Sequence, residues 1–198
     1  MNSEVTLTNY STSQNPKGQI RLLFKRSDAH HAVLYEHNVP RFYLTTSDGF
    51  SKVKIRDEAR RKVVAEVNRR TFLRNIFKFV ERNDGKAVNA AHVLKQAPTT
   101  NAGQLSMSLH TEQGTYLWRK KRSYSWALYE ESSDTPVVWM ETISGAAPTW
   151  ELVVESQASS ILDYVLASLF YLKATTDCTE AGKAWESVDG RVLSLTII

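Results

Sequence analysis

The sequence predicts a mostly β domain (α+β), a closed antiparallel barrel of about twelve strands around one buried apolar helix. Strand-like runs follow one another between residues 20 and 155, each bounded by turn residues. Residues 160–175 then form a helix that is hydrophobic on every face, so protein or lipid must surround it. At roughly 1.5 Å per residue it is about 22 Å long, too short to cross a bilayer. A closed barrel has no free strand edge, and the helix supplies its core.

The expected strands form two groups, separated by a less regular stretch. The first group comprises residues 20–25, 32–37, 41–46, 52–56, 63–68 and 76–81, and the second comprises 105–110, 116–120, 123–130, 137–143 and 150–155. Asp48-Gly49 and Asp84-Gly85 predict tight turns. Residues 87–95 are compatible with a short helix or with another strand, and 97–103 predict a loop.

One strand has a clear alternation of apolar and basic residues. Successive side chains of a strand point to opposite faces, so Val53 and Ile55 are expected to face the core. Lys52, Lys54 and Arg56 then lie on the outer face. The pattern predicts a half-buried strand with a basic outer surface.

The helix carries polar signals near both ends. Ser160 is a suitable N-cap, and Asp163 three residues later resembles a capping box and complements the helix dipole. Lys173 suits the opposite pole. Four tryptophans recur in the strands that precede the helix, and most of them are expected in the core: Trp118, Trp126, Trp139 and Trp150.

The length of 198 residues suits one domain with a tail at each end. Residues 1–17 are rich in Ser, Thr and Asn and predict a flexible N-terminal segment, followed by the barrel with its helix over 18–175. Residues 176–198 form a C-terminal extension, in which the β-branched run 191–198 suits an edge strand. The start of the chain has no secretory signal and Cys178 is the single cysteine, which favours an intracellular protein of the cytoplasm or nucleus, or one peripheral at membranes.

The net charge of +4 is unevenly distributed. Residues 51–82 hold eleven Lys or Arg against four acids, whereas residues 130–198 hold eleven acids against three bases. A molecule polarised in this way can orient itself on an anionic surface. The alternative is a solvated basic face together with an acidic tail.

Motifs for catalysis or metal binding are not found in the sequence. It has no Gly-x-Ser-x-Gly elbow and no phosphate loop, and Cys178 lies beside acidic residues that disfavour its thiolate. His30 and His31 are adjacent, so on a strand they point to opposite faces and cannot share one ion. We therefore expect no enzyme, no cofactor and no metal.

Two groups of cations are the candidate sites for an anionic headgroup. The first lies on the basic strand and in the turn after it, and the second lies at a hairpin tip: Lys52, Lys54, Arg56, Arg60 and Arg61, and then Arg119, Lys120, Lys121 and Arg122. A further cluster of Arg69, Arg70 and Arg74 follows the first group. Such groups hold phosphates through charge-assisted hydrogen bonds, although cations at strand edges also serve to discourage aggregation.

Several short motifs carry a family resemblance: Tyr116-Leu117-Trp118, Trp126-Ala127-Leu128, Pro136-Val137-Val138, and Ile161-Leu162-Asp163-Tyr164-Val165 with Phe170-Tyr171-Leu172. With these the chain resembles the tubby C-terminal-like superfamily, which includes tubby-like proteins, phospholipid scramblases and LURP-one-related proteins. More specifically, it resembles a fungal group of domains, DUF6593. The resemblance covers about residues 20–175 and is clearest from residue 115 onward.

The resemblance implies a barrel around a central helix and, in the tubby-like branch, phosphoinositide headgroups bound to a basic surface. The binding residues of that branch have no matching local motif here. We expect a non-enzymatic domain that binds phosphoinositide or other anionic lipid headgroups. The alternative is a protein-protein interaction domain that uses the C-terminal extension. Nucleic-acid binding is a weaker reading, because no helix-turn-helix, zinc or RNA-platform signature accompanies the charge.

Overall fold

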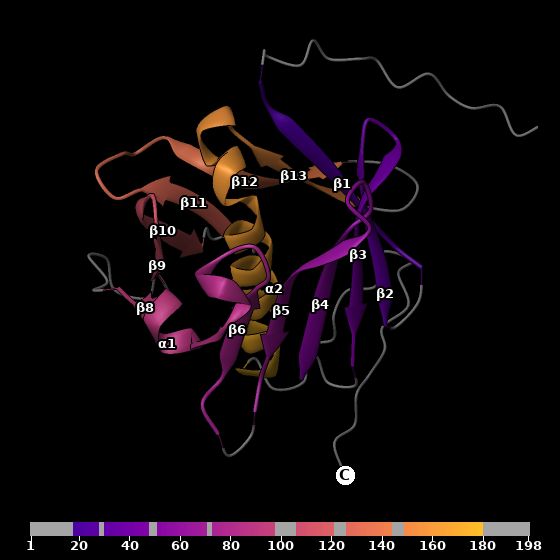
Figure 1. The fold of residues 1–198 in the computed structure, drawn as a ribbon. Helices are drawn as coiled ribbons and strands as arrows, with labels where there is room; N and C mark the ends of the chain where they lie inside the picture. Colours follow the sequence, from indigo (N-terminus) through magenta and orange to yellow (C-terminus); the bar gives the residue numbers. More distant parts are fainter. Residues whose placement is uncertain are drawn as a thin grey trace, which may run out of the picture.

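The computed structural model describes residues 18–27, 30–47, 51–70, 73–97, 106–120, 126–143 and 149–179. Within them, one antiparallel sheet of 13 strands curls around a single long helix, α2 (Leu162–Thr179) (Figure 1). The mostly β class is thus confirmed. The predictions of a flexible segment over 1–17 and of an edge strand over 191–198 lie outside the described residues.

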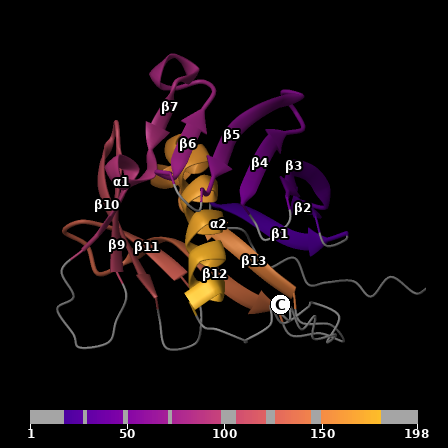
Figure 2. The ribbon, with the colours of Figure 1, turned by 90° about the horizontal axis from the view of Figure 1, so that it is seen from below.

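The strands follow the chain in two halves. The first half comprises β1 (Ile20–Arg26), β2 (His31–Glu36), β3 (Val39–Thr46), β4 (Lys52–Asp57), β5 (Lys62–Asn68), β6 (Ile76–Phe79) and β7 (Ala87–Asn89). The second comprises β8 (Leu94–Gln96), β9 (Ser106–Thr111), β10 (Gly114–Lys120), β11 (Trp126–Glu130), β12 (Pro136–Ile143) and β13 (Thr149–Val154). β1 pairs with β13 in the middle of the sheet, and the two halves extend outward from this pair to the edge strands β7 and β8. α2 lies inside the curled sheet (Figure 2).

The prediction of a closed barrel is wrong, because β7 and β8 are the two edges of the sheet and do not pair. The helical turn α1 (Ala90–Val93) separates them. Asn89 caps this turn, since its side-chain oxygen accepts a hydrogen bond from the Ala91 backbone N–H at 3.0 Å. The sequence left residues 87–95 open between a helix and a strand, and the structure has both in this stretch. The strands on either side of α1, β7 and β8, are only three residues long.

The helix is buried as expected, but it begins and ends differently. A 3₁₀ turn, η3 (Ser156–Ile161), leads into α2, and the Ser160 hydroxyl donates to the Gln113 side chain at 2.6 Å rather than capping the helix. α2 continues to Thr179, beyond the predicted end at residue 175. No helix in the described part of the chain combines the length and apolarity that a bilayer crossing needs.

Inside the sheet, α2 makes a fully buried polar contact among apolar ones. The fully buried Ser168 hydroxyl accepts a hydrogen bond from the Trp118 indole N–H at 3.0 Å and donates to the Tyr164 carbonyl at 2.6 Å. Both buried polar groups are thereby paired, which avoids the cost of an unsatisfied donor. Of the four tryptophans expected in the core, Trp118 and Trp126 are buried, whereas Trp139 and Trp150 are only half-buried.

The predicted alternation of β4 is confirmed. Val53 and Ile55 are buried in the core, while Lys52 and Arg56 are exposed and Lys54 is half-buried on the other face. This outer face of the sheet carries three residues of the first predicted cation group, Lys52, Lys54 and Arg56.

Candidate anion-binding surface

The two ends of the curled sheet carry different connections. β1, β3 and β5 run toward one end, which therefore holds the β1–β2, β3–β4 and β5–β6 connections; we call it the loop end. The β2–β3, β4–β5 and β6–β7 connections lie at the opposite end, which we call the turn end. α2 runs from the turn end, where Asp163 contacts Arg82, to the loop end, where Tyr171 contacts Asn75.

A groove with a volume of about 480 Å³ lies on the outer face of β2–β5. Its walls come from two rows of side chains that cross the strands in register, one with His31, Thr45 and Lys54 and the other with Val33, Tyr43 and Arg56. Ser27, in the β1–β2 connection, also lines the groove, which therefore reaches the loop end. The volume falls in the range of small-ligand sites.

Lys54 and Arg56, two of the predicted site residues, both line this groove. Each has one weak acidic partner: the Lys54 ammonium lies 3.5 Å from Glu66, and the Arg56 guanidinium lies 3.2 Å from Glu58. The Arg56 guanidinium also lies over the Tyr43 ring, 5.0 Å from its centre. Ion pairs at exposed positions contribute about 0–1 kcal/mol, so an incoming phosphate can replace these carboxylates at little cost.

Lys52 lies next to the groove at the loop end, where further cations gather. It pairs in register with Asn68, and the backbone N–H of Arg69 donates to Ser51 at 2.6 Å, so the β5–β6 loop begins beside it. The exposed Arg70 and Arg74 belong to this loop. Among the described residues, no carboxylate forms an ion pair with Lys52, Arg70 or Arg74, which leaves their charge uncompensated.

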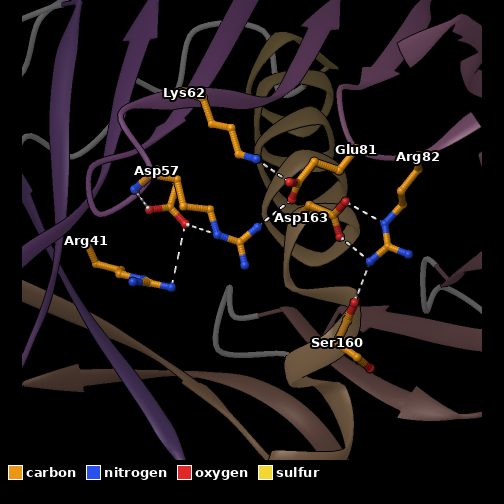
Figure 3. A network of polar contacts seen from close by, with 8 residues as sticks. Arg41, Asp57, Lys62, Glu81, Arg82, Ser160 and Asp163 are labelled. Carbon is orange, nitrogen blue, oxygen red and sulfur yellow. Dashed lines mark hydrogen bonds and ion pairs between the residues drawn. The ribbon is translucent and has the colours of Figure 1, made fainter. Parts of the chain in front are cut away.

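Arg60 has a structural role at the turn end instead. The buried carboxylate of Asp57 accepts a hydrogen bond from the Arg60 backbone N–H at 3.1 Å and lies 3.6 Å from the Arg41 guanidinium (Figure 3). Arg60 also contacts Glu81 at 2.5 Å, and Lys62 contacts the other oxygen of that carboxylate. The hydrogen bond from Lys62, supported by the charge of Arg60, lowers the pKa of Glu81. These cations are already occupied by carboxylates.

Arg61 is exposed in the same turn and has a left-handed backbone, with φ 50°. It follows Arg60 in the β4–β5 connection, away from the loop end. The predicted group is therefore divided: Lys54 and Arg56 share the groove, Lys52 adjoins it, and Arg60 and Arg61 lie at the turn end.

The described residues of the second predicted group, Arg119 and Lys120, do not reach the groove. In the sheet, β10 is separated from β4 by β3, β2, β1, β13, β12 and β11. Arg119 lies over the Tyr129 ring, 4.5 Å from its centre, and 3.5 Å from Asp134. Lys120 is half-buried, and Lys121 and Arg122 lie outside the described residues.

The sequence did not point to three contributors to this surface. His31 and Tyr43 reach Lys54 and Arg56 only through the pairing of β2, β3 and β4, which the sequence leaves open. Leu73 is exposed between Arg70 and Arg74, and its only signal was an apolar residue within an arginine cluster.

In the part of the chain that the structure describes, no group of three or more His, Cys, Asp or Glu side chains is arranged to hold a metal ion. The groove combines two cations, hydroxyls and an aromatic ring with the apolar side chains of Val33, Leu44 and Val63, and its cations are the groups that could bind an anion.

Comparison with known proteins gives one informative result. No curated protein and no solved structure matches the chain. A family model described as a family of unknown function, DUF6593, matches residues 19–176, from the start of β1 to the last turns of α2. The chain therefore belongs to the DUF6593 family.

Proposed function

We propose that this protein is a non-enzymatic binding domain of the tubby-like kind, which holds phosphoinositide or other anionic lipid headgroups at a membrane surface. The observation that carries the proposal is the placement of Lys54 and Arg56 in one groove, beside the exposed cations of the loop end, for which the described residues supply no carboxylate. A protein-protein role for residues 176–198 has no comparable support, because those beyond Thr179 lie outside the described residues.

The groove has the chemistry that a phosphate requires. Arg56 offers a planar fork of donors that can bind two oxygens of one phosphate, and Lys54 adds a compact charge. The Tyr43 ring lies beneath the Arg56 guanidinium and fixes one face of it. A headgroup with more than one phosphate can use both rows of the groove, whereas a single carboxylate cannot.

Long-range attraction supports the same function. The excess of cations over residues 51–82 lies on the half of the sheet that carries the groove. Basic residues near an anionic membrane contribute about 1 kcal/mol each, and this attraction falls off within a Debye length. The domain would therefore approach an acidic membrane with this half first.

Kinship with the tubby-like superfamily is part of the proposal. It is supported by an antiparallel sheet that curls around one apolar C-terminal helix, and by the short motifs shared with that superfamily. The open edge between β7 and β8 is a departure from the expected architecture.

The test is co-sedimentation of the full chain with neutral, phosphatidylserine and phosphoinositide vesicles, at low and physiological salt. The variant Lys54→Ser/Arg56→Ser should weaken phosphoinositide binding by about tenfold or more, since two charge-assisted contacts are lost. The matched control Lys86→Ser/Lys95→Ser removes the same charge from exposed positions on other strands and connections and should bind almost normally.

Two outcomes would contradict the proposal. Equal weakening in both double variants, with binding that fades at physiological salt, would reduce the interaction to general surface charge. Loss of binding in Arg119→Ser/Lys120→Ser alone would place the site at the β10–β11 hairpin instead of the groove.

A further inference from the structure

We infer that the β5–β6 loop inserts Leu73 into the membrane, so that the loop end is the face turned toward the lipid. The inference rests on the proposed function for the nature of the surface, an anionic bilayer. It adds an apolar contact and a defined orientation, neither of which a headgroup groove alone requires.

Leu73 is an unusual side chain for its position. It is 66% exposed, and the other large hydrophobic residues exposed in the described chain are Val39 at 63% and Val80 at 39%. A single exposed apolar residue is common on protein surfaces and means little by itself. Leu73 differs from Val39 and Val80 because it lies between two exposed arginines.

The cations around Leu73 differ from the cation beside Val39. Arg70 and Arg74 flank it in the loop, both are exposed, and within the described residues neither has a carboxylate partner. Val39, in contrast, lies at the turn end between Glu36 and Arg41, which form an ion pair of 3.7 Å. An apolar tip between unpaired arginines suits the bilayer interface, where the cations meet phosphates and the apolar group lies below them.

The base of the loop is fixed before any lipid is bound. The backbone N–H of Arg70 donates to the Asn75 side-chain oxygen at 2.8 Å, and the amide group of Asn75 donates to the Tyr171 hydroxyl of α2 at 2.9 Å. The Arg69 backbone N–H donates to Ser51 at 2.6 Å. Both α2 and the β3–β4 connection thus hold the described residues at the base of the loop, Arg69, Arg70 and Asn75, so these residues lose little further conformational entropy on insertion.

The groove and Leu73 can be engaged together. Ser27 extends the groove to the β1–β2 connection, which lies at the same end of the sheet as the β5–β6 loop. Lys52 lies on the outer face between them, on the strand that pairs with both β3 and β5. A membrane that meets the loop end thus presents headgroups to the groove and its acyl boundary to Leu73.

The experiment compares the full chain with Leu73→Ser and with the matched control Val39→Ser, which removes an equally exposed apolar side chain at the turn end. Each is measured against phosphoinositide vesicles and against a soluble inositol phosphate. Leu73→Ser should weaken vesicle binding by about tenfold, the value of burying about two methylene groups, and leave binding of the soluble inositol phosphate unchanged. Val39→Ser should change neither.

Salt dependence separates insertion from attraction. The deficit of Leu73→Ser should persist at high salt, because apolar burial is not screened, whereas Arg70→Ser/Arg74→Ser should lose most at low salt. Vesicle binding by Leu73→Ser equal to that of the native chain would overturn the insertion and leave the proposed function intact. Failure of the native chain to bind either vesicles or the soluble inositol phosphate would overturn both.

Discussion

The two ends of the sheet use the same kinds of side chain in opposite ways. At the turn end, basic residues other than the exposed Arg61 are paired with carboxylates, most of them in two separate groups (Figure 3). Asp57 and Glu81 pair with Arg41, Arg60 and Lys62, and Asp163 pairs with Arg82. At the loop end, Lys52, Arg70 and Arg74 are exposed, and the described residues supply them with no carboxylate partner. Among the described residues, charge therefore stabilises the fold at the turn end, whereas the proposed function makes use of the charge at the loop end.

The position of α2 explains why the turn end needs this network. The guanidinium of Arg82 donates to both oxygens of Asp163 at 2.6 and 3.0 Å and also to the Ser160 carbonyl. It lies 4.9 Å from the centre of the Tyr164 ring. The hydrogen bonds to Asp163 outweigh desolvation and raise the pKa of Arg82. One side chain thereby fastens the first turn of the central helix to the β6–β7 connection.

The largest expected effect follows from breaking this contact. Arg82→Met should lower the free energy of unfolding by about 2–3 kcal/mol, since it leaves the mostly buried Asp163 carboxylate without its main partner. Urea unfolding followed by circular dichroism measures the change. Lys86→Met, which removes a cation paired only with the exposed Asp84, is the control and should stay within about 0.5 kcal/mol.

Vesicle binding by Arg82→Met also tests the roles of the two ends. Where it remains folded, Arg82→Met should bind anionic vesicles as the native chain does, because the altered contact lies at the turn end. A variant that kept native stability but lost vesicle binding would reverse the roles assigned to the two ends.

The parts of the fold that were predictable are those in which burial repeats along the chain. The alternation in residues 52–56 and the apolar helix both predict their environment without knowledge of any neighbour. The closed barrel was not predictable in this way. Whether β7 pairs with β8 depends on a local competition, in which the Asn89 cap and the turn of α1 displace the strand pairing that closure needs.

The residues that meet in the candidate site were even less predictable from the sequence. Cations on one strand face could be read from the sequence, but their neighbours depend on register. A bulge between Ile55 and Arg56 and another between Leu34 and Tyr35 set which side chains meet across the strands. The pairing of Arg60 with Glu81, which are 21 residues apart, likewise follows only from the folded sheet.

A smaller effect is expected at the loop end, where the helix holds the base of the β5–β6 loop. Tyr171→Phe should lower the free energy of unfolding by about 1 kcal/mol, because the Asn75 amide loses its acceptor. A double-mutant cycle of Tyr171→Phe and Asn75→Ala isolates the coupling free energy between the two side chains, since the other contacts of Asn75 cancel. A coupling of zero would mean that the hydrogen bond does not hold the loop.

The smallest expected effect is a change in melting temperature. It is measured on two matched double variants, one at each end, that each remove two cations. Arg60→Ser/Lys62→Ser takes away both partners of Glu81, whereas Arg70→Ser/Arg74→Ser breaks no ion pair within the described residues. Near pH 7 only the first should lower the melting temperature, and only slightly, because exposed ion pairs contribute little. The second should leave the melting temperature unchanged and weaken binding to anionic vesicles at low salt.

The effect of the turn-end double variant on stability should depend on pH. Lys62 and Arg60 lower the pKa of Glu81 below its ordinary value of 4.5, so the stability they confer is present above that pH. It is lost as pH falls through the lower pKa of the folded state. The melting temperatures of the native chain and of Arg60→Ser/Lys62→Ser should therefore differ at about pH 7 and converge toward about pH 3, while Arg70→Ser/Arg74→Ser follows the native curve throughout. If both double variants shifted the melting temperature equally at about pH 7, the loop-end arginines would also stabilise the fold. The assignment of different roles to the cations of the two ends would then be wrong.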